Sequence, residues 1–170
     1  DEWLYRGGEP DLDVEFEDHP DQASLVVSEN VVPGGITGYK DGLFKMPVVI
    51  ELHYTDHTAA RGTFWIEHST QIIEIPKKEG ASIAYVLFDP GSRILKSLNF
   101  PKSTEMLLAQ AADAPEMMDR YDALVALRGV PLSQKADLLR DSYRREKFFA
   151  PRLEALGLSS FAAYERYLRF

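Results

Sequence analysis

The sequence predicts an α+β protein whose strands and helices lie in separate halves, an antiparallel β-sandwich followed by an α-helical segment. Apolar residues recur at every second position in much of the first half, which is typical of strands with one buried face. Beyond Pro101 the apolar spacing changes to the 3.6-residue period of amphipathic helices. We therefore expect an immunoglobulin-like sandwich over residues 1–100 and the start of an α-helical, HEAT-like solenoid domain over residues 101–170.

The strand pattern is clearest at residues 12–16 and 48–54, where apolar and more polar side chains alternate. Further strands are predicted at residues 23–28, 62–68, 71–75, 82–88 and 94–100. Turn-like breaks separate several of them, at residues 56–61, 76–80 and 89–92. Short strands with such breaks favour an antiparallel sandwich. Residues 29–45 form a long connection that contains glycine.

The second half predicts a series of helices joined by short turns. Ser103 is expected to cap a helix that ends near Ala112, and residues 113–116 (DAPE) form a capping box for a second helix that ends at Gly129. The next helices are predicted to begin at Ser133, at Pro151 (ending at Gly157) and at Ser160. Their expected inward residues are Met117, Tyr121, Leu124, Val125, Ala136, Leu139, Tyr143, Phe161, Tyr164 and Leu168. Such short paired helices suggest a solenoid.

Charge is distributed unevenly along the chain, which has a net charge of −8. Residues 1–100 carry 17 acidic and 8 basic side chains, whereas residues 101–170 carry 10 acidic and 11 basic ones. An acidic surface opposes the counterion release that drives nucleic-acid binding, and anionic lipids repel it. We expect neither nucleic acid nor a membrane as a partner.

Other features of composition bear on compartment and completeness. Without cysteine the chain has no disulfide framework and no thiolate metal ligand. It contains no apolar run of the ~18–20 residues that cross a bilayer, and its N-terminus lacks the order of a signal peptide. We expect a soluble protein, cytoplasmic or periplasmic. Because it begins at Asp1 and shows no catalytic constellation, we expect a piece of a larger protein.

The four histidines do not form a recognisable metal site. His53 and His57 have the spacing of two zinc ligands on a helix, but no glutamate follows His53 and the pair lies near a strand end. We interpret them as solvated or locally hydrogen-bonded, and His19 and His68 add no evident partner. The sequence therefore predicts no metal, cofactor or catalytic residue within this chain.

Three other segments have a functional and a structural reading. The acidic residues Asp11, Asp13, Glu15 and Glu17 could form a calcium ladder, but same-face residues on a strand diverge, which favours a solvated outer face. The loop at residues 34–40 (GGITGYK) resembles a phosphate loop in composition only. Aromatic residues at strand positions usually serve the core, although they can also line a sugar- or peptide-binding surface. The residues concerned are Trp3, Tyr5, Trp65 and Tyr85.

Several motifs occur in an order that resembles the zinc aminopeptidases of the aminopeptidase N (gluzincin) family. They are residues 3–14 (WLYRGGEPDLDV), 43–50 (LFKMPVVI), 88–96 (FDPGSRILK) and 119–124 (DRYDAL) with Leu127. In that family they correspond to the opening and middle of a β-sandwich, the segment leading into the helical domain, and the first helices of that domain. The zinc ligands and the catalytic residues of the family lie in an upstream domain and have no counterpart here.

The resemblance implies that this chain is a non-catalytic structural fragment of a zinc-dependent aminopeptidase that removes N-terminal residues from peptides. Its expected partners are the catalytic domain of the parent chain and, indirectly, the peptide substrate, with zinc bound by the parent only. A dimer formed through exposed helices is a further expectation. Two alternatives stay open: a free-standing adhesion or carbohydrate-binding β-sandwich, and a scaffold from a relative that lacks zinc.

Overall fold

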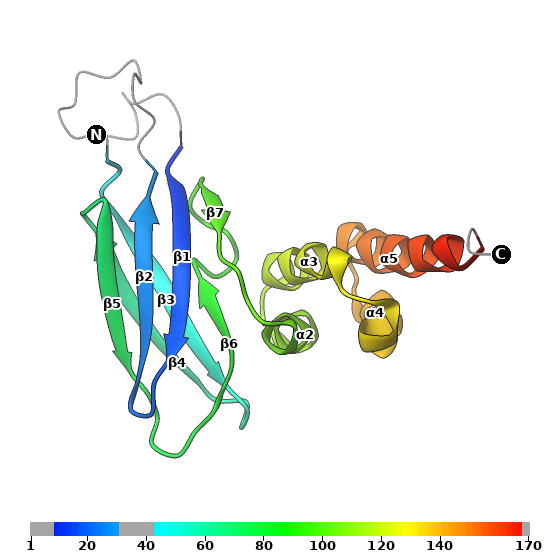
Figure 1. The fold of residues 1–170 in the computed structure, drawn as a ribbon, viewed down its shortest axis with the longest axis horizontal. Coiled ribbons are helices and arrows are strands. Elements are labelled where there is room, and N and C mark those ends of the chain that lie inside the picture. Colours follow the sequence, from blue (N-terminus) through cyan, green and yellow to red (C-terminus); the bar gives the residue numbers. More distant parts are fainter. Residues whose placement is uncertain (1–8, 31–42, 168–170) are drawn as a thin grey trace. The chain divides into compact units, whose positions relative to one another are not determined.

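A computed structural model describes residues 9–30 and 43–167, with side chains up to residue 158 (Figure 1). Its strands are β1 (Asp11–Asp18), β2 (Gln22–Glu29), β3 (Met46–Tyr54), β4 (Ala59–Ile66), β5 (Thr70–Pro76), β6 (Ile83–Phe88) and β7 (Ser97–Asn99). Its helices are α2 (Thr104–Asp113), α3 (Met117–Ala126), the 3₁₀ turn η1 (Leu127–Gly129), α4 (Leu132–Arg145) and α5 (Phe149–Tyr167). The predicted class is confirmed: strands come first and helices follow.

The strands form two sheets that lie face to face (Figure 1). One sheet has the order β5-β2-β1-β7 and the other β4-β3-β6. Strands β1 and β2 pair antiparallel with Val14 opposite Val27, and β3 pairs with β4 with Ile50 opposite Gly62. A Cβ at Gly62 would lie 2.6 Å from the Phe64 ring, so a larger residue there would displace that ring.

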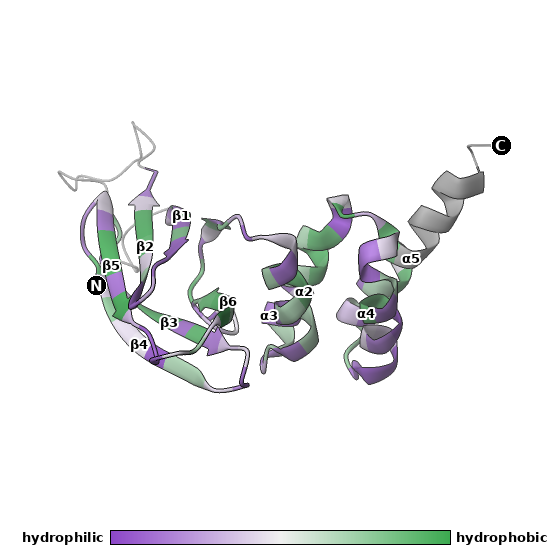
Figure 2. Cartoon of the chain, turned by 60° about the horizontal axis from the view of Figure 1, so that its bottom comes forward, coloured by the Kyte–Doolittle hydropathy of each residue, from purple (hydrophilic) through white to green (hydrophobic). Residues whose placement is uncertain are grey.

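The sandwich core follows from the alternation of the strands. In β3 the predicted apolar set is buried, with Val48, Ile50 and Leu52 at 0% exposure. Bands of opposite hydropathy along the strands are visible in Figure 2. Because successive side chains point to opposite faces, each strand presents one apolar row to the other sheet.

Not every strand pairing in this sandwich is antiparallel. The short strand β7 pairs parallel with β1, with Leu12 opposite Leu98. Its preceding neighbour β6 belongs to the other sheet, so no hairpin forces β7 to run antiparallel to its partner. Two predicted boundaries also move: β4 begins at Ala59 inside the predicted turn, and β7 covers only part of residues 94–100.

The first two helices bear out one predicted cap and overturn the other. Ser103 caps α2, and its Oγ accepts a hydrogen bond from the Met106 amide at 3.2 Å. Asp113 is the last residue of α2 and not a cap, because α3 begins after Glu116, whose side chain forms no cap hydrogen bond. The predicted capping box is therefore wrong, since Pro115 lies in the turn before the helix.

The last two helices also differ from the predicted ones. Helix α4 begins at Leu132 after Pro131, and it buries Lys135, Leu139 and Ser142. Ala136 and Tyr143, predicted to point inward, are exposed. Helix α5 is continuous where two short helices were predicted, because Gly157 lies in the helix interior without ending it. The side chains of Phe161, Tyr164 and Leu168 lie outside the described part.

The chain divides into two compact units at Lys102 and Ser103, except that residues Ala84–Val86 of β6 group with the helices. The core of the helical unit is small, and its fully buried members include Leu124, Leu127 and Leu139. Within residues 9–30 and 43–167, no helix combines the length and apolar character needed to span a bilayer.

Candidate functional site

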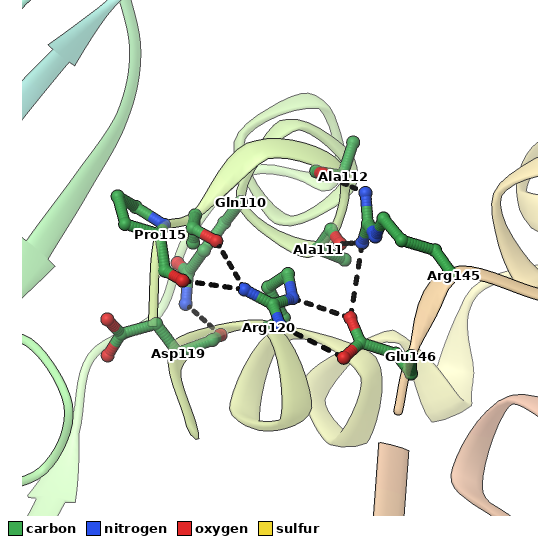
Figure 3. A network of polar contacts seen from close by, with 9 residues as sticks. Gln110, Ala111, Ala112, Pro115, Asp119, Arg120, Arg145 and Glu146 are labelled. Atoms are coloured by element: carbon green, nitrogen blue, oxygen red, sulfur yellow. Dashed lines mark hydrogen bonds and ion pairs between the residues drawn. The ribbon is translucent and has the colours of Figure 1, made fainter. Parts of the chain in front are cut away.

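A network of charged side chains lies where helices of the second unit end (Figure 3). Arg120, on α3, donates two hydrogen bonds to the carboxylate of Glu146, which follows α4: Nε to Oε1 at 2.5 Å and Nη2 to Oε2 at 2.9 Å. Its Nη1 donates to the carbonyls of Ala114 and Pro115 at 2.8 Å each. One guanidinium thus holds a carboxylate and the turn that follows α2.

A second arginine completes this group. Arg145, at the end of α4, donates through Nη1 to the carbonyl of Ala112 and through Nη2 to that of Ala111 at 2.9 Å. These carbonyls lie in the last turn of α2, where backbone acceptors lack partners within the helix and carry the negative end of the helix dipole. We call Arg120, Arg145 and Glu146 the helix-end network.

Burial and charge complementarity set the protonation of this network. The Glu146 side chain is 3% exposed, and the Arg120 side chain is 17% exposed. The hydrogen bonds from Arg120 hold the pKa of Glu146 below its usual value despite burial. The same contact raises the pKa of Arg120. Both groups are therefore charged near neutral pH, and each provides the hydrogen-bond partner and the countercharge of the other.

A hollow of about 480 Å³ lies beside the network. Its wall includes the apolar side chains of Met117 and Phe148 and the charged groups of Asp113 and Lys147, besides the network itself. The guanidinium groups on this wall already donate to carbonyls and to Glu146. The network consequently fixes helix ends, and its geometry presents no nucleophile next to a base.

A similar contact holds the end of α3 and η1. Lys135 on α4 is 3% exposed, and its Nζ donates to the carbonyl of Leu127 at 2.6 Å. Burial lowers the pKa of Lys135. Arg128 and Glu154 form a bidentate pair at 2.7 and 2.8 Å, and this hydrogen bonding lowers the pKa of Glu154. The ends of α2 and of α3 with η1 are thus tied to later helices.

Among the described residues of the sandwich unit, Asp89 and Lys96 form a buried ion pair, and their side chains are each 4% exposed. Asp89 Oδ2 also accepts a hydrogen bond from the Ile94 amide at 2.9 Å, and the Asp89 amide donates to the Val49 carbonyl at 2.8 Å. Asp89 adopts a φ of 56°. The segment FDPGSRILK thus has a physical role, because its aspartate and its lysine close the loop between β6 and β7.

The acidic residues of β1 are solvated or paired with amide groups and lysine. Asp13 accepts hydrogen bonds from Asn30 Nδ2 at 2.8 Å and from Asn99 Nδ2 at 2.7 Å, and the contact with Asn30 contributes most to lowering its pKa. Asp18 pairs with Lys77 at 2.5 Å. Donors, and not converging carboxylates, surround these oxygens.

The histidines lie apart, as far as the described residues show. His53 Nε2 contacts Glu51 at 2.8 Å, and Arg61 contacts the other oxygen of Glu51 at 3.3 Å. His57 adopts a φ of 62° in the turn after β3. The described ranges contain no group of three or more His, Cys, Asp or Glu arranged to hold a metal ion.

The remaining sequence candidates do not form a site in the described part. Tyr85 is buried at 3% exposure, as expected of a core aromatic, whereas Trp65 is 58% exposed. Residues 34–40, together with Trp3 and Tyr5, lie outside the described residues.

Sequence reasoning missed the helix-end network. Arg120 and Glu146 are 26 residues apart, and no motif links them. The available signal was weak: basic residues in the last turn of a predicted helix commonly cap carbonyls. The sequence indicated the contact of Lys135 even less, because a lysine at an inward position interrupts the apolar face from which a buried position is predicted.

Comparison with known proteins supports the fold. The chain is similar to the crystal structure of Legionella pneumophila aminopeptidase A in complex with aspartic acid, with a TM-score of 0.56 and 14% identity. The match covers 91% of this chain and 17% of that protein. The chain therefore has an aminopeptidase-like fold and spans about one sixth of that protein's length. No profile of a known protein family matches the sequence, and no characterised protein matches it by sequence.

Proposed function

We propose that this chain is a non-catalytic structural part of a zinc-dependent aminopeptidase of the aminopeptidase N type. The observation that carries the proposal is the fold likeness to an aminopeptidase, which covers 91% of the chain and includes both strands and helices. The motifs that resemble this family occur in the same order along the chain, and the loop motif at residues 88–96 forms a buried ion pair.

In this proposal the sandwich braces the catalytic domain of the parent, and the helices, arranged as the start of a HEAT-like solenoid, help to enclose the peptide. Zinc is bound by the parent's catalytic domain, and the parent removes N-terminal residues from peptides. Such catalysis needs three protein ligands around the metal and a carboxylate base, which belong to the catalytic domain. This chain contributes stability and confinement of the substrate.

The first test is the reading frame of the parent gene. It should encode H-E-x-x-H with a downstream glutamate ahead of the segment described here. A parent without these ligands would refute the enzyme proposal and favour a scaffold.

The second test uses the 170-residue chain itself. We expect no turnover of a panel of aminoacyl-anilides and no stoichiometric zinc binding by calorimetry. Zinc binding that His53→Ala abolishes, or activity that persists through purification, would contradict the proposal. In the parent, deletion of this segment should lower activity and thermal stability while the catalytic domain keeps one zinc.

One observation favours a binding module as a second candidate. Trp65 is 58% exposed on β4. Exposed aromatic faces on a rigid sheet can stack on sugar rings or contact a peptide. Screening against an immobilised glycan panel tests this candidate: binding that Trp65→Ala removes would support it, and an unchanged profile would exclude it.

A further inference from the structure

The hollow beside the helix-end network is large enough for a small molecule. Its volume of about 480 Å³ falls within the range of small-molecule sites, about 300–1,000 Å³. Two turns form its wall, the turn between α2 and α3 and the turn between α4 and α5. The wall residues all lie between Ala112 and Phe148, and the helices on both sides of each turn are described. The hollow is therefore formed within the described helices.

The guanidinium groups on this wall are already engaged. Arg120 donates to Glu146 and to two carbonyls, and Arg145 donates to two carbonyls at the end of α2 (Figure 3). Arg120 and Glu146 also cancel each other's charge. A charged ligand in the hollow would therefore be bound by other groups of the wall.

Two exposed side chains of opposite charge on the wall can bind such a ligand. Asp113 lies at the end of α2, and Lys147 lies in the turn after α4. In the part of the chain that the structure describes, these two side chains form no ion pair with each other or with a third residue. The hollow thus offers one anionic and one cationic group to a ligand.

The position of Asp113 is unfavourable for its own helix. Asp113 is the last residue of α2, and the C-terminal end of a helix carries a partial negative charge that disfavours a carboxylate. The last turn of α2 contains no basic residue of its own. Because Asp113 does not stabilise this helix end, its charge is explained better by a cation that binds beside it.

Apolar side chains complete the wall. Met117, at the start of α3, is half-buried, and Phe148 is 47% exposed. An apolar group that lies against them leaves water, which favours binding in proportion to the area removed. The flexible methionine side chain can also adapt to the shape of such a group. The wall therefore combines an anion, a cation and an apolar surface.

We propose that this hollow binds a small zwitterion with an apolar side chain, either a free amino acid or a dipeptide. Asp113 accepts hydrogen bonds from the ammonium group of the ligand, and Lys147 donates to its carboxylate. The side chain of the ligand lies against Met117 and Phe148. A simple anion is disfavoured by Asp113, and a simple cation by Lys147. The argument for this site does not depend on the proposed aminopeptidase function.

The first test uses the 170-residue chain with isotope-labelled methionine methyl groups, titrated with leucine and with leucyl-leucine and followed by NMR. Met117 lines the hollow, whereas Met46 is buried in the sandwich and Met118 does not belong to the wall. We expect the methyl signal of Met117 to move saturably, with a dissociation constant of about 1 mM, while those of Met46 and Met118 stay in place. The ligand that binds more tightly identifies the source of the zwitterion.

Blocked forms of that ligand test the two charges. For leucine, N-acetyl-leucine lacks the ammonium group and leucinamide lacks the carboxylate. Each should bind about tenfold more weakly or worse, because a charge-assisted hydrogen bond is lost. Asp113→Asn should remove the preference over N-acetyl-leucine, and Lys147→Met should remove the preference over leucinamide. Asp137→Asn and Arg144→Met, at exposed positions outside the wall, are the controls and should change neither preference. Circular dichroism confirms that each variant is folded.

Four results would overturn the proposal. They are a Met117 signal that neither ligand moves, equal binding of the blocked and unblocked ligands, preferences that survive Asp113→Asn and Lys147→Met, and equal shifts of all methionine signals. Inorganic phosphate that binds as tightly as leucine would likewise replace the zwitterion with an anion. None of these results affects the zinc and hydrolysis tests of the aminopeptidase proposal.

Discussion

The sandwich unit and the helical unit bury different kinds of residue. The sandwich core is built from branched and aromatic side chains in alternating rows, and its described buried polar residues are Ser24, Glu29 and Asp89. The described core of the helical unit is smaller and includes several alanines, and it buries Gln110, Asp119, Lys135, Ser142 and Glu146. One unit is held mainly by apolar area, whereas the other depends on polar contacts at helix ends.

Geometry explains this difference. A sheet satisfies its backbone groups through its neighbours, so the sandwich interior needs few polar side chains. Each short helix instead leaves up to four carbonyls without partners, and burial of those ends requires donors. Arg120, Arg145 and Lys135 supply them. In the described part of the sandwich unit, the ion pair with both side chains buried is Asp89–Lys96, in the loop where the chain leaves regular structure.

The largest loss of stability is expected when a core side chain of the sandwich is truncated, which tests whether apolar burial is the main support of that unit. Leu52→Ala removes a side chain with 0% exposure from the central strand of its sheet, and should cost about 4 kcal/mol through lost burial and a cavity. Amide hydrogen exchange, followed segment by segment during denaturation, reports the loss on β3 and β4. Leu95→Ala, at a 69% exposed site, serves as the control and should change stability little. A loss below about 1 kcal/mol for Leu52→Ala would contradict an apolar core as the main support.

The second prediction concerns charge in the helical unit. Glu146→Gln leaves the Arg120 guanidinium without its buried countercharge and should destabilise the helices by about 3 kcal/mol. The matched control is Glu154→Gln, because Glu154 has the same bidentate geometry but an arginine partner that is 60% exposed. It should cost about 1 kcal/mol or less. The measurement is denaturant unfolding followed by circular dichroism. Equal losses for the two variants would mean that burial does not determine how much each ion pair stabilises the helices.

Protonation of Glu146 should make the stability of the helical unit depend on pH. The ordinary pKa of Glu146 is 4.5, and its pKa in the folded protein is lower, chiefly because Arg120 donates to it. Its contribution to the free energy of unfolding is therefore complete above about pH 4.5 and is lost as the pH falls through the lower folded value. Thermal unfolding of the helices between neutral and acidic pH should show this loss, and Glu146→Gln should reduce the slope. Glu154, whose pKa is also lowered, accounts for part of the remainder.

Sequence patterns predicted what depends on local spacing. The alternation in β3 and the capping serine of α2 are both visible in the chain, and both are confirmed. The parallel pairing of β7 was not predictable, because it depends on a crossing between sheets that no local pattern encodes. Of the residues predicted to face inward on α4, Leu139 is buried, but Ala136 and Tyr143 are exposed because Lys135 and Ser142 occupy the buried face beside Leu139. Lys135 is inward since its ammonium reaches carbonyls of another helix end, a contact that periodicity does not reveal.

The smallest expected loss of stability concerns the residue that begins a helix of this unit. It compares two serines, both of which the sequence predicts as helix starts. Ser103 accepts a hydrogen bond from the Met106 amide as the cap of α2. Ser133 lies exposed in the first turn of α4, whose cap position is Pro131. Ser103→Ala should therefore cost about 1 kcal/mol, because an amide of the first turn loses its acceptor. Ser133→Ala should leave stability unchanged or raise it slightly, since alanine has the higher helix propensity. Denaturant unfolding of both variants under one condition decides the matter: equal losses would place the start of α4 at Ser133, whereas a loss confined to Ser103→Ala shows that cap geometry, and not residue type, sets the helix start.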